Sequence, residues 1–85
     1  MKNILYFTAD WCNPCAKTKP IVEELNRDSS DVKFQVIDAD IESAMARSFE
    51  VRSIPTFIVI KDGEEIKRVS GSQTKEQLQE LMSYE

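Results

Sequence analysis

The chain has 85 residues, of which 41% are hydrophobic and 31% are charged, so it has the composition of a globular protein and the length of one domain, residues 1–85. Its 11 basic and 15 acidic residues give a net charge of −4, which opposes binding to nucleic acid or to an anionic membrane. The apolar runs are far shorter than the roughly 18 residues of a membrane span and too short for a signal peptide. We therefore expect a cytoplasmic protein.

The first predicted element is a strand over residues 3–8, because this run is almost continuously apolar and aromatic, as in a central strand that is covered on both faces. A loop and then a helix follow, from Pro14, which suits a first helical turn, to about Arg27. Pro20 should kink this helix without ending it. Residues repeating every three or four positions predict its buried face: Cys15, Thr18, Ile21, Val22 and Leu25.

A second strand is predicted where Val32, Phe34 and Val36 alternate with polar residues, which indicates one solvated face at a sheet edge. Asp40 is expected to cap a short helix over residues 41–49, and Asp38 to serve in the preceding turn. The residues predicted to share the inner face of that helix are Ile41, Ala44, Met45 and Ser48.

The dipeptide Asp62-Gly63 lies between two strand patterns, residues 56–61 and 64–69, and predicts a β-hairpin. Thr74 and Gln77 form a capping-box pattern at the start of a last helix that ends near residue 84. Its inward residues should be Leu78, Leu81 and Met82. The whole order is β-α-β-α-β-β-α, an α/β fold in which the first two strands are parallel and joined by a right-handed crossover.

The cysteines of the chain, Cys12 and Cys15, are three positions apart at the start of the first predicted helix. Backbone N–H groups there favour a thiolate, and a second thiol one turn later can displace a mixed disulfide formed at the first. The spacing therefore predicts dithiol redox chemistry, with Cys12, at the exposed helix start, as nucleophile and Cys15 as resolving thiol. A structural bridge closing so short a loop would add little stability, and a zinc site lacks ligands.

The chain resembles the thioredoxin family over essentially its whole length. The features that carry the resemblance are the strand that leads into Ala9-Asp10-Trp11-Cys12-Asn13-Pro14-Cys15, the helix proline Pro20, the acids Asp38 and Asp40, Ser53-Ile54-Pro55-Thr56, and Gly71. The resemblance implies a minimal thioredoxin fold without the additional first strand and helix of that family. It also implies a four-stranded mixed sheet in the order 2-1-3-4, with helices on both faces.

The resemblance further implies a cis proline at Pro55 beside the active-site disulfide, and an apolar groove in which the Ile54 backbone pairs with an extended substrate segment. The groove residues would be Trp11, Ile54, Pro55 and Gly71. The implied activity is that of a monomeric protein disulfide reductase that binds no cofactor or metal. It would take electrons, ultimately from NADPH, from a partner of the thioredoxin-reductase type and pass them to target disulfides such as that of ribonucleotide reductase.

The chain departs from the family around the cysteines. Tyr6 and Val36 stand where the family keeps a buried acid and a lysine. A phenol has a pKa of about 10, and burial raises it further, so Tyr6 cannot act as a base near neutral pH. We therefore expect water or the leaving thiolate to deprotonate the resolving cysteine. Asn13 replaces the glycine that usually precedes the proline at the position of Pro14, and we expect Asn13 and Pro14 to shape the site. Thr8 replaces a tryptophan that is common in the family.

Two other functions remain open from the sequence. A glutaredoxin that works with glutathione would fit the short chain, although Gly71-Ser72-Gln73-Thr74 lacks the glycine and acidic pair that glutaredoxins place around the glutathione amine. A binding module that uses the scaffold without redox chemistry is the second alternative, and the presence of both cysteines argues against it.

Overall fold

A four-stranded sheet forms the centre of the structure, a computed structural model that describes residues 2–85 and all of their side chains except that of Pro14. The elements in chain order are β1 (Lys2–Thr8), α1 (Asn13–Asp28), β2 (Lys33–Asp38), α2 (Ser43–Ser48), β3 (Thr56–Lys61), β4 (Glu64–Ser70) and α3 (Lys75–Met82). The strand order is β2-β1-β3-β4, in which β1 and β2 are parallel and the other pairs antiparallel. The predicted fold class and strand order are confirmed.

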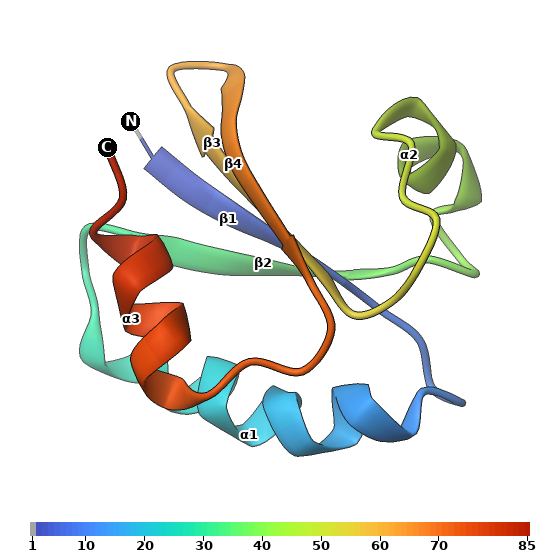
Figure 1. Ribbon diagram of the computed structural model, residues 1–85, viewed down its shortest axis with the longest axis horizontal. Helices are drawn as coiled ribbons and strands as arrows, with labels where there is room; N and C mark the ends of the chain where they lie inside the picture. The colour runs from blue at the N-terminus through green and yellow to red at the C-terminus, as the bar shows by residue number, and fades with distance from the viewer. Residues whose placement is uncertain (1) are drawn as a thin grey trace.

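The helices cover both faces of the sheet, as Figure 1 shows: α1 and α3 lie together on one side and α2 on the other. Strand β1 is buried on both faces because Ile4 and Tyr6 pack beneath α1 and α3, whereas Leu5 and Phe7 pack beneath α2. This placement confirms the central strand that was predicted from the apolar run. Because β1 is packed on both faces, its position is fixed, and the cysteine loop follows directly from its end.

The local turn and cap signals predicted from the sequence are present. Asp62 and Gly63 have positive φ angles of 52° and 85°, as a tight hairpin turn between β3 and β4 requires. Thr74 and Gln77 form the complete capping box of α3. Helix α1 continues through Pro20, and its predicted inner stripe is buried or half-buried.

The segment around α2 differs from the prediction. The helix covers only Ser43–Ser48, Ala46 is its buried residue, and Ile41 is 77% exposed in the turn before it. Asp40 does not cap the helix, whose N-cap is Glu42 without a side-chain hydrogen bond. A helix of fewer than two turns shows too little periodicity for its inner face to be recognised.

Strand β2 also differs in one respect, because neither of its faces is simply solvated. Phe34 is buried beneath α1 and α3 and Ile37 beneath α2, whereas Val36 is 46% exposed. The alternation predicted through Val36 is therefore wrong at the end of the strand, where α2 covers the face that was expected to meet solvent. The predicted edge position of β2 is confirmed.

The open edge of β2 is partly closed by a side chain of α1. The Phe34 N–H donates to Asn26 Oδ1 at 2.7 Å, and Asn26 Nδ2 donates to the Phe34 carbonyl at 3.0 Å. The carboxamide thus satisfies the donor and the acceptor of Phe34, as a neighbouring strand would. It ties the last turn of α1 to the sheet.

We predict that Asn26→Leu lowers the free energy of unfolding by about 1–3 kcal/mol, because two hydrogen bonds to half-buried backbone groups are lost. Urea denaturation measures the change. Glu23→Leu, at an exposed position of the same helix, is the matched control and should stay close to the wild type. Equal stability of the two variants would contradict a structural role for the carboxamide.

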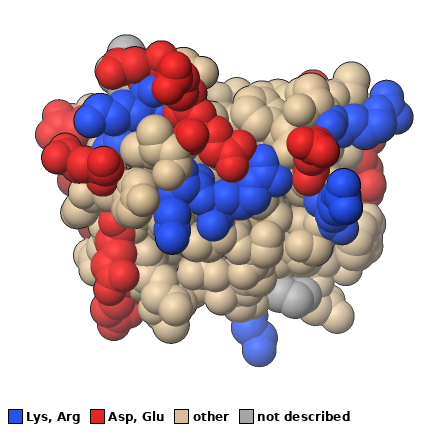
Figure 2. Space-filling view, turned by 45° about the horizontal axis from the view of Figure 1, so that its top comes forward, with Lys and Arg blue, Asp and Glu red and all other residues tan. Residues whose placement is uncertain are grey.

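Charged side chains of both signs share the face of the molecule shown in Figure 2. Lys and Arg lie among Asp and Glu there, so this face has no extended surface of a single sign. Among residues 2–85, no helix is long and apolar enough to cross a membrane.

Candidate active site

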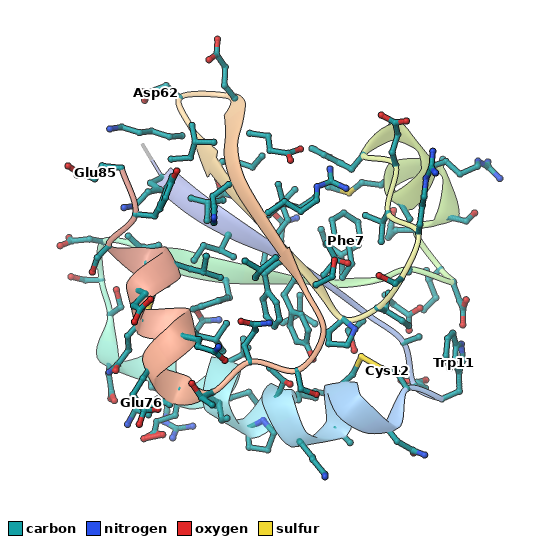
Figure 3. The ribbon with its side chains drawn as sticks, in the orientation of Figure 1. Phe7, Trp11, Cys12, Asp62, Glu76 and Glu85 are labelled. Atoms are coloured by element: carbon teal, nitrogen blue, oxygen red, sulfur yellow. A yellow bond between two sulfur atoms is a disulfide. The ribbon has the colours of Figure 1, made fainter. Side chains whose placement is uncertain are left out.

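The site begins where the chain turns from the end of β1 into α1. Cys12 is the N-cap residue of α1, with an extended backbone, and its N–H donates to the Ala9 carbonyl at 3.1 Å. The Cys15 N–H donates to Cys12 Sγ at 3.2 Å. The two cysteines form a disulfide with their Cα atoms 5.2 Å apart, which lies at the start of α1 in Figure 3. Cys12 Sγ thus accepts a hydrogen bond from one of the N–H groups of the first helical turn that have no partner within the helix.

Both cysteines are buried, with 5% exposure for Cys12 and 2% for Cys15. The expectation that Cys12 is exposed is therefore wrong, because Ala9 and Ile54 pack against the pair. The hydrogen bond, and not exposure, distinguishes the two sulfurs. A thiolate at Cys12 would accept the same N–H, at the positive end of the helix dipole, and this lowers the pKa of such a thiol.

The segment before β3 approaches the disulfide through Ile54 and Pro55. The peptide bond between them is cis, Pro55 is buried, and Ile54 is half-buried against the cluster of Ala9, Cys12 and Cys15. Gly71 donates its N–H to the Pro55 carbonyl at 2.8 Å. Gly71 has a φ of 89°, a conformation that residues with a side chain rarely adopt.

Trp11 stands at the rim of the site, 67% exposed and directed outward beside the disulfide in Figure 3. Its Nε1 donates to Asp40 Oδ2 at 2.7 Å. Asp40 therefore accepts a hydrogen bond from Trp11 and does not form the predicted helix cap. Asp38 keeps its predicted turn role, since its Oδ1 accepts from the N–H groups of Asp40 and Ile41.

Trp11 and Ile54 line the same surface hollow, whose volume is ≈ 260 Å³. The other residues that line it are Ala39, Val51, Arg52 and Ser53. Ile54 thus belongs both to this hollow and to the packing around the cysteine cluster, and Gly71 is linked to the neighbouring Pro55 by its hydrogen bond. Asn13 is exposed in the first turn of α1, whereas the side chain of Pro14, predicted to shape the site, lies outside the described residues.

Tyr6 lies beneath the site with no exposed surface. Its ring stacks on Phe57 with 4.7 Å between centroids, and its O–H donates to the Cys15 carbonyl at 3.1 Å. Burial raises the pKa of the Tyr6 phenol above its ordinary value, and a side-chain interaction with Thr8 opposes this only in part. Tyr6 is therefore a neutral hydrogen-bond donor to the backbone and supplies no base at neutral pH.

The raised pKa of Tyr6 makes a prediction for alkaline solution. Stability from the neutral phenol is fully present below the unfolded pKa of about 10 and is lost as the pH rises through the higher folded pKa. A Tyr6→Phe variant should lose about 1 kcal/mol at neutral pH, for the hydrogen bond, but should lack this alkaline loss. Urea unfolding at neutral and alkaline pH tests it. Tyr84→Phe, at an exposed tyrosine, should keep the wild-type dependence, and an alkaline loss in Tyr6→Phe equal to that of the wild type would contradict the assignment.

A second hollow, of ≈ 190 Å³, opens beside the disulfide and shares no residue with the first. It is lined by Thr8, Ala9, Asp10, Cys12, Cys15, Ala16 and Lys19. The sequence did not indicate Asp10 and Lys19 as neighbours of the cysteines. Lys19 stands one helical turn after Cys15, and this spacing was the available signal.

Arg68 is a further residue that sequence reasoning missed. Its guanidinium donates to both carboxylate oxygens of Glu65, at 2.9 and 3.0 Å, and to the carbonyls of Phe49 at 2.6 Å and Glu50 at 3.3 Å. Arg68 thereby joins β4 to the end of α2, where the segment that carries Ile54 begins. Charged residues in an edge strand ordinarily predict only a solvated face, so no local signal indicated this contact.

No group of His, Cys, Asp and Glu suited to a metal ion occurs within the described part of the chain.

The amino-acid sequence is similar to those of known thioredoxins. The Thioredoxin family profile matches residues 1–84. A thioredoxin of Staphylococcus saprophyticus is 44% identical over 82 residues, which are 94% of this chain and 78% of that protein. A thioredoxin of Bacillus subtilis is 42% identical over 78 residues, 91% of this chain and 75% of that protein.

Solved structures show the same similarity in three dimensions. The X-ray structure of Fasciola hepatica thioredoxin has a TM-score of 0.90 and 35% identity, covering 96% of this chain and 78% of that one. A mutant thioredoxin from Halobacterium salinarum has a TM-score of 0.89 and 35% identity, covering 96% of this chain and 72% of that one.

Proposed function

Since the chain belongs to the thioredoxin family and its Cys12–Cys15 pair makes it a protein disulfide reductase, we propose that it carries electrons from a partner of the thioredoxin-reductase type to disulfides in target proteins. NADPH would be the ultimate electron source. The observation that carries the proposal is the hydrogen bond from the Cys15 N–H to Cys12 Sγ at the start of α1. It places one sulfur where a thiolate is stabilised and the other one turn away.

In the proposed reaction the Cys12 thiolate attacks a sulfur of the target disulfide. A bond forms between Cys12 and that sulfur, and the other target sulfur leaves as a thiolate. Cys15 then loses its proton and attacks Cys12 Sγ, which forms the intramolecular disulfide and releases the second target sulfur. The target gains two electrons and two protons in all, and the dithiol of this chain is oxidised.

The groove for the target consists in this proposal of Trp11, Ile54, Pro55 and Gly71. Its support is geometric. Ile54 packs against the cluster of Ala9 and the two cysteines and at the same time lines the hollow of ≈ 260 Å³ with Trp11. Asp40 holds the exposed indole of Trp11 in place. An extended target segment could lie across Pro55 and pair with the backbone of Ile54 by strand addition.

We place this reaction in the cytoplasm, where thiols are kept reduced, and we propose that the chain acts as one domain and as a monomer. Ribonucleotide reductase is one candidate target. Binding of this target is a proposal that rests on the family resemblance.

Two coupled assays test the electron source. The oxidised protein should be reduced rapidly by NADPH with a bacterial thioredoxin reductase, and the reduced protein should then reduce insulin. NADPH with glutathione and glutathione reductase should act much more slowly. The reverse ranking would favour the glutaredoxin-like alternative, and failure of the protein to reduce insulin with either donor would favour a binding module.

A further inference from the structure

The resolving step needs a proton to leave Cys15, and none of the described Asp, Glu or Lys side chains that could act as its base is buried. Cys15 is 2% exposed, and the residue beneath it, Tyr6, donates its own O–H to the Cys15 carbonyl. Burial of Tyr6 raises the pKa of its phenol. The proton must therefore leave by another route.

The hollow lined by Thr8 and both cysteines gives Cys15 such a route. Its volume of ≈ 190 Å³ is far above the roughly 10–15 Å³ that one water needs. A hydroxyl residue, Thr8, and two charged residues, Asp10 and Lys19, line it together with the cysteines. Water prefers a space with several polar partners, and this hollow has them.

The charged and titratable residues around Cys15 come from three segments. Tyr6 belongs to β1, Asp10 to the loop after β1, and Lys19 to α1. The segment that carries Ile54 places its own charged residue, Arg52, in the other hollow, beside Trp11. Asp10 and Lys19 are therefore the charges that share a hollow with the resolving cysteine.

We propose that this hollow is the proton outlet of the resolving cysteine: Cys15 loses its proton to water there, and Lys19 and Asp10 promote and oppose this loss, respectively. The inference rests on the proposed resolving role of Cys15. The Cys15 S–H bond breaks, water carries the proton to bulk solvent, and the thiolate electron pair forms the bond to Cys12 Sγ. The target sulfur leaves with the electron pair of the broken mixed disulfide and is protonated by solvent.

A two-phase thiol assay isolates this step. Reduced protein is mixed with 5,5′-dithiobis(2-nitrobenzoate), and released thionitrobenzoate is followed by stopped flow. The first phase reports attack by Cys12, and the second, independent of reagent concentration, reports attack by Cys15 on the mixed disulfide. Because thionitrobenzoate is a weakly basic leaving group, it cannot take the Cys15 proton. The second phase, measured across pH, therefore reports ionisation of Cys15.

We expect Lys19→Met to move the midpoint of the second phase up by about one pH unit, which makes it about tenfold slower below the midpoint and equal to the wild type above it. Asp10→Asn should move the midpoint down. Thr8→Leu, which fills the hollow with an apolar side chain, should move it up, whereas Thr8→Ser should not. Opposite shifts from the two charge changes are an electrostatic signature that altered packing would not produce.

Lys17→Met is the matched control, because Lys17 is exposed on the same helix and does not line the hollow. It should leave the midpoint unchanged. Midpoints that agree with the wild type in Lys19→Met and Asp10→Asn, with a normal second phase, would overturn the proton outlet alone. A wild-type protein without a second phase would instead overturn the resolving role of Cys15 on which the inference rests.

Discussion

A Cys12→Ser variant is expected to lose disulfide reduction completely. The serine hydroxyl is not a nucleophile toward disulfides at neutral pH, and Cys12 Sγ is the sulfur that accepts an N–H group at the start of α1. Removal of Cys12 therefore removes both the thiolate and the sulfur through which electrons pass. Reduction of insulin with dithiothreitol as donor should fall to the rate of dithiothreitol alone.

The fold should survive this change, so the loss can be assigned to chemistry. Serine is a favourable N-cap residue and can accept the Cys15 N–H in place of Cys12 Sγ. Thermal unfolding of the variant should be compared with that of the reduced wild type, so that the missing disulfide does not bias the result. A folded Cys12→Ser protein that still accelerates insulin reduction would show that Cys15 can attack by itself, and the assigned order would then be wrong.

The parts of the fold that the sequence predicted well are those set by local pattern. Strand β1 is a continuous apolar run, the β3–β4 turn needs the positive φ angles of Asp62 and Gly63, and α3 begins with a capping box. Each of these signals acts within a few residues, and the packing of the sheet agrees with it. The dithiol chemistry of the cysteine pair was also predicted, because it depends on two local features, the spacing of the cysteines and their position at the start of a helix.

The parts that could not be predicted depend on contacts between segments far apart in the chain. Asp40 was expected to cap a helix, but it accepts a hydrogen bond from Trp11, 29 residues away. Arg68 of β4 donates to the carbonyls of Phe49 and Glu50, which directly follow α2. From the sequence alone, a polar side chain such as Asp40 or Arg68 could form a hydrogen bond with a neighbour in the chain or with a distant segment. The folded structure determines which partner it binds.

The burial of the cysteines also depends on a contact between segments that are far apart in the chain. A helix start is exposed in isolation, but Ile54, about 40 residues later in the chain, packs against the cluster that contains both cysteines. The cluster of Ala9, Cys12 and Cys15 thus packs against an apolar side chain, Ile54, and its residues also line a hollow together with Thr8, Asp10 and Lys19. In the proposed function, a target would approach through the groove of Trp11 and Ile54, and water in this hollow would take the proton of Cys15.

A Cys15→Ser variant should accumulate a covalent adduct instead of turning over. Cys12 keeps its place at the helix N-terminus, so attack on a target disulfide still occurs, but no second thiol of the chain displaces the mixed disulfide. Incubation with an excess of a disulfide-bonded protein should yield a stoichiometric mixed disulfide at Cys12. Intact-mass spectrometry and non-reducing gels measure it, and dithiothreitol should release it.

The matched comparison for this trap is the double variant Cys12→Ser with Cys15→Ser, which should form no adduct. If Cys15→Ser forms none either, while the wild type reduces the same target, then Cys12 is not the attacking thiol. If instead Cys12→Ser forms the adduct, the two roles are exchanged. A stable adduct also makes the groove testable, because Trp11→Ala should slow its formation, and Asp40→Ala, which removes the acceptor of the Trp11 hydrogen bond, should slow it less. Trapping therefore tests the order of attack and the proposed groove in one experiment.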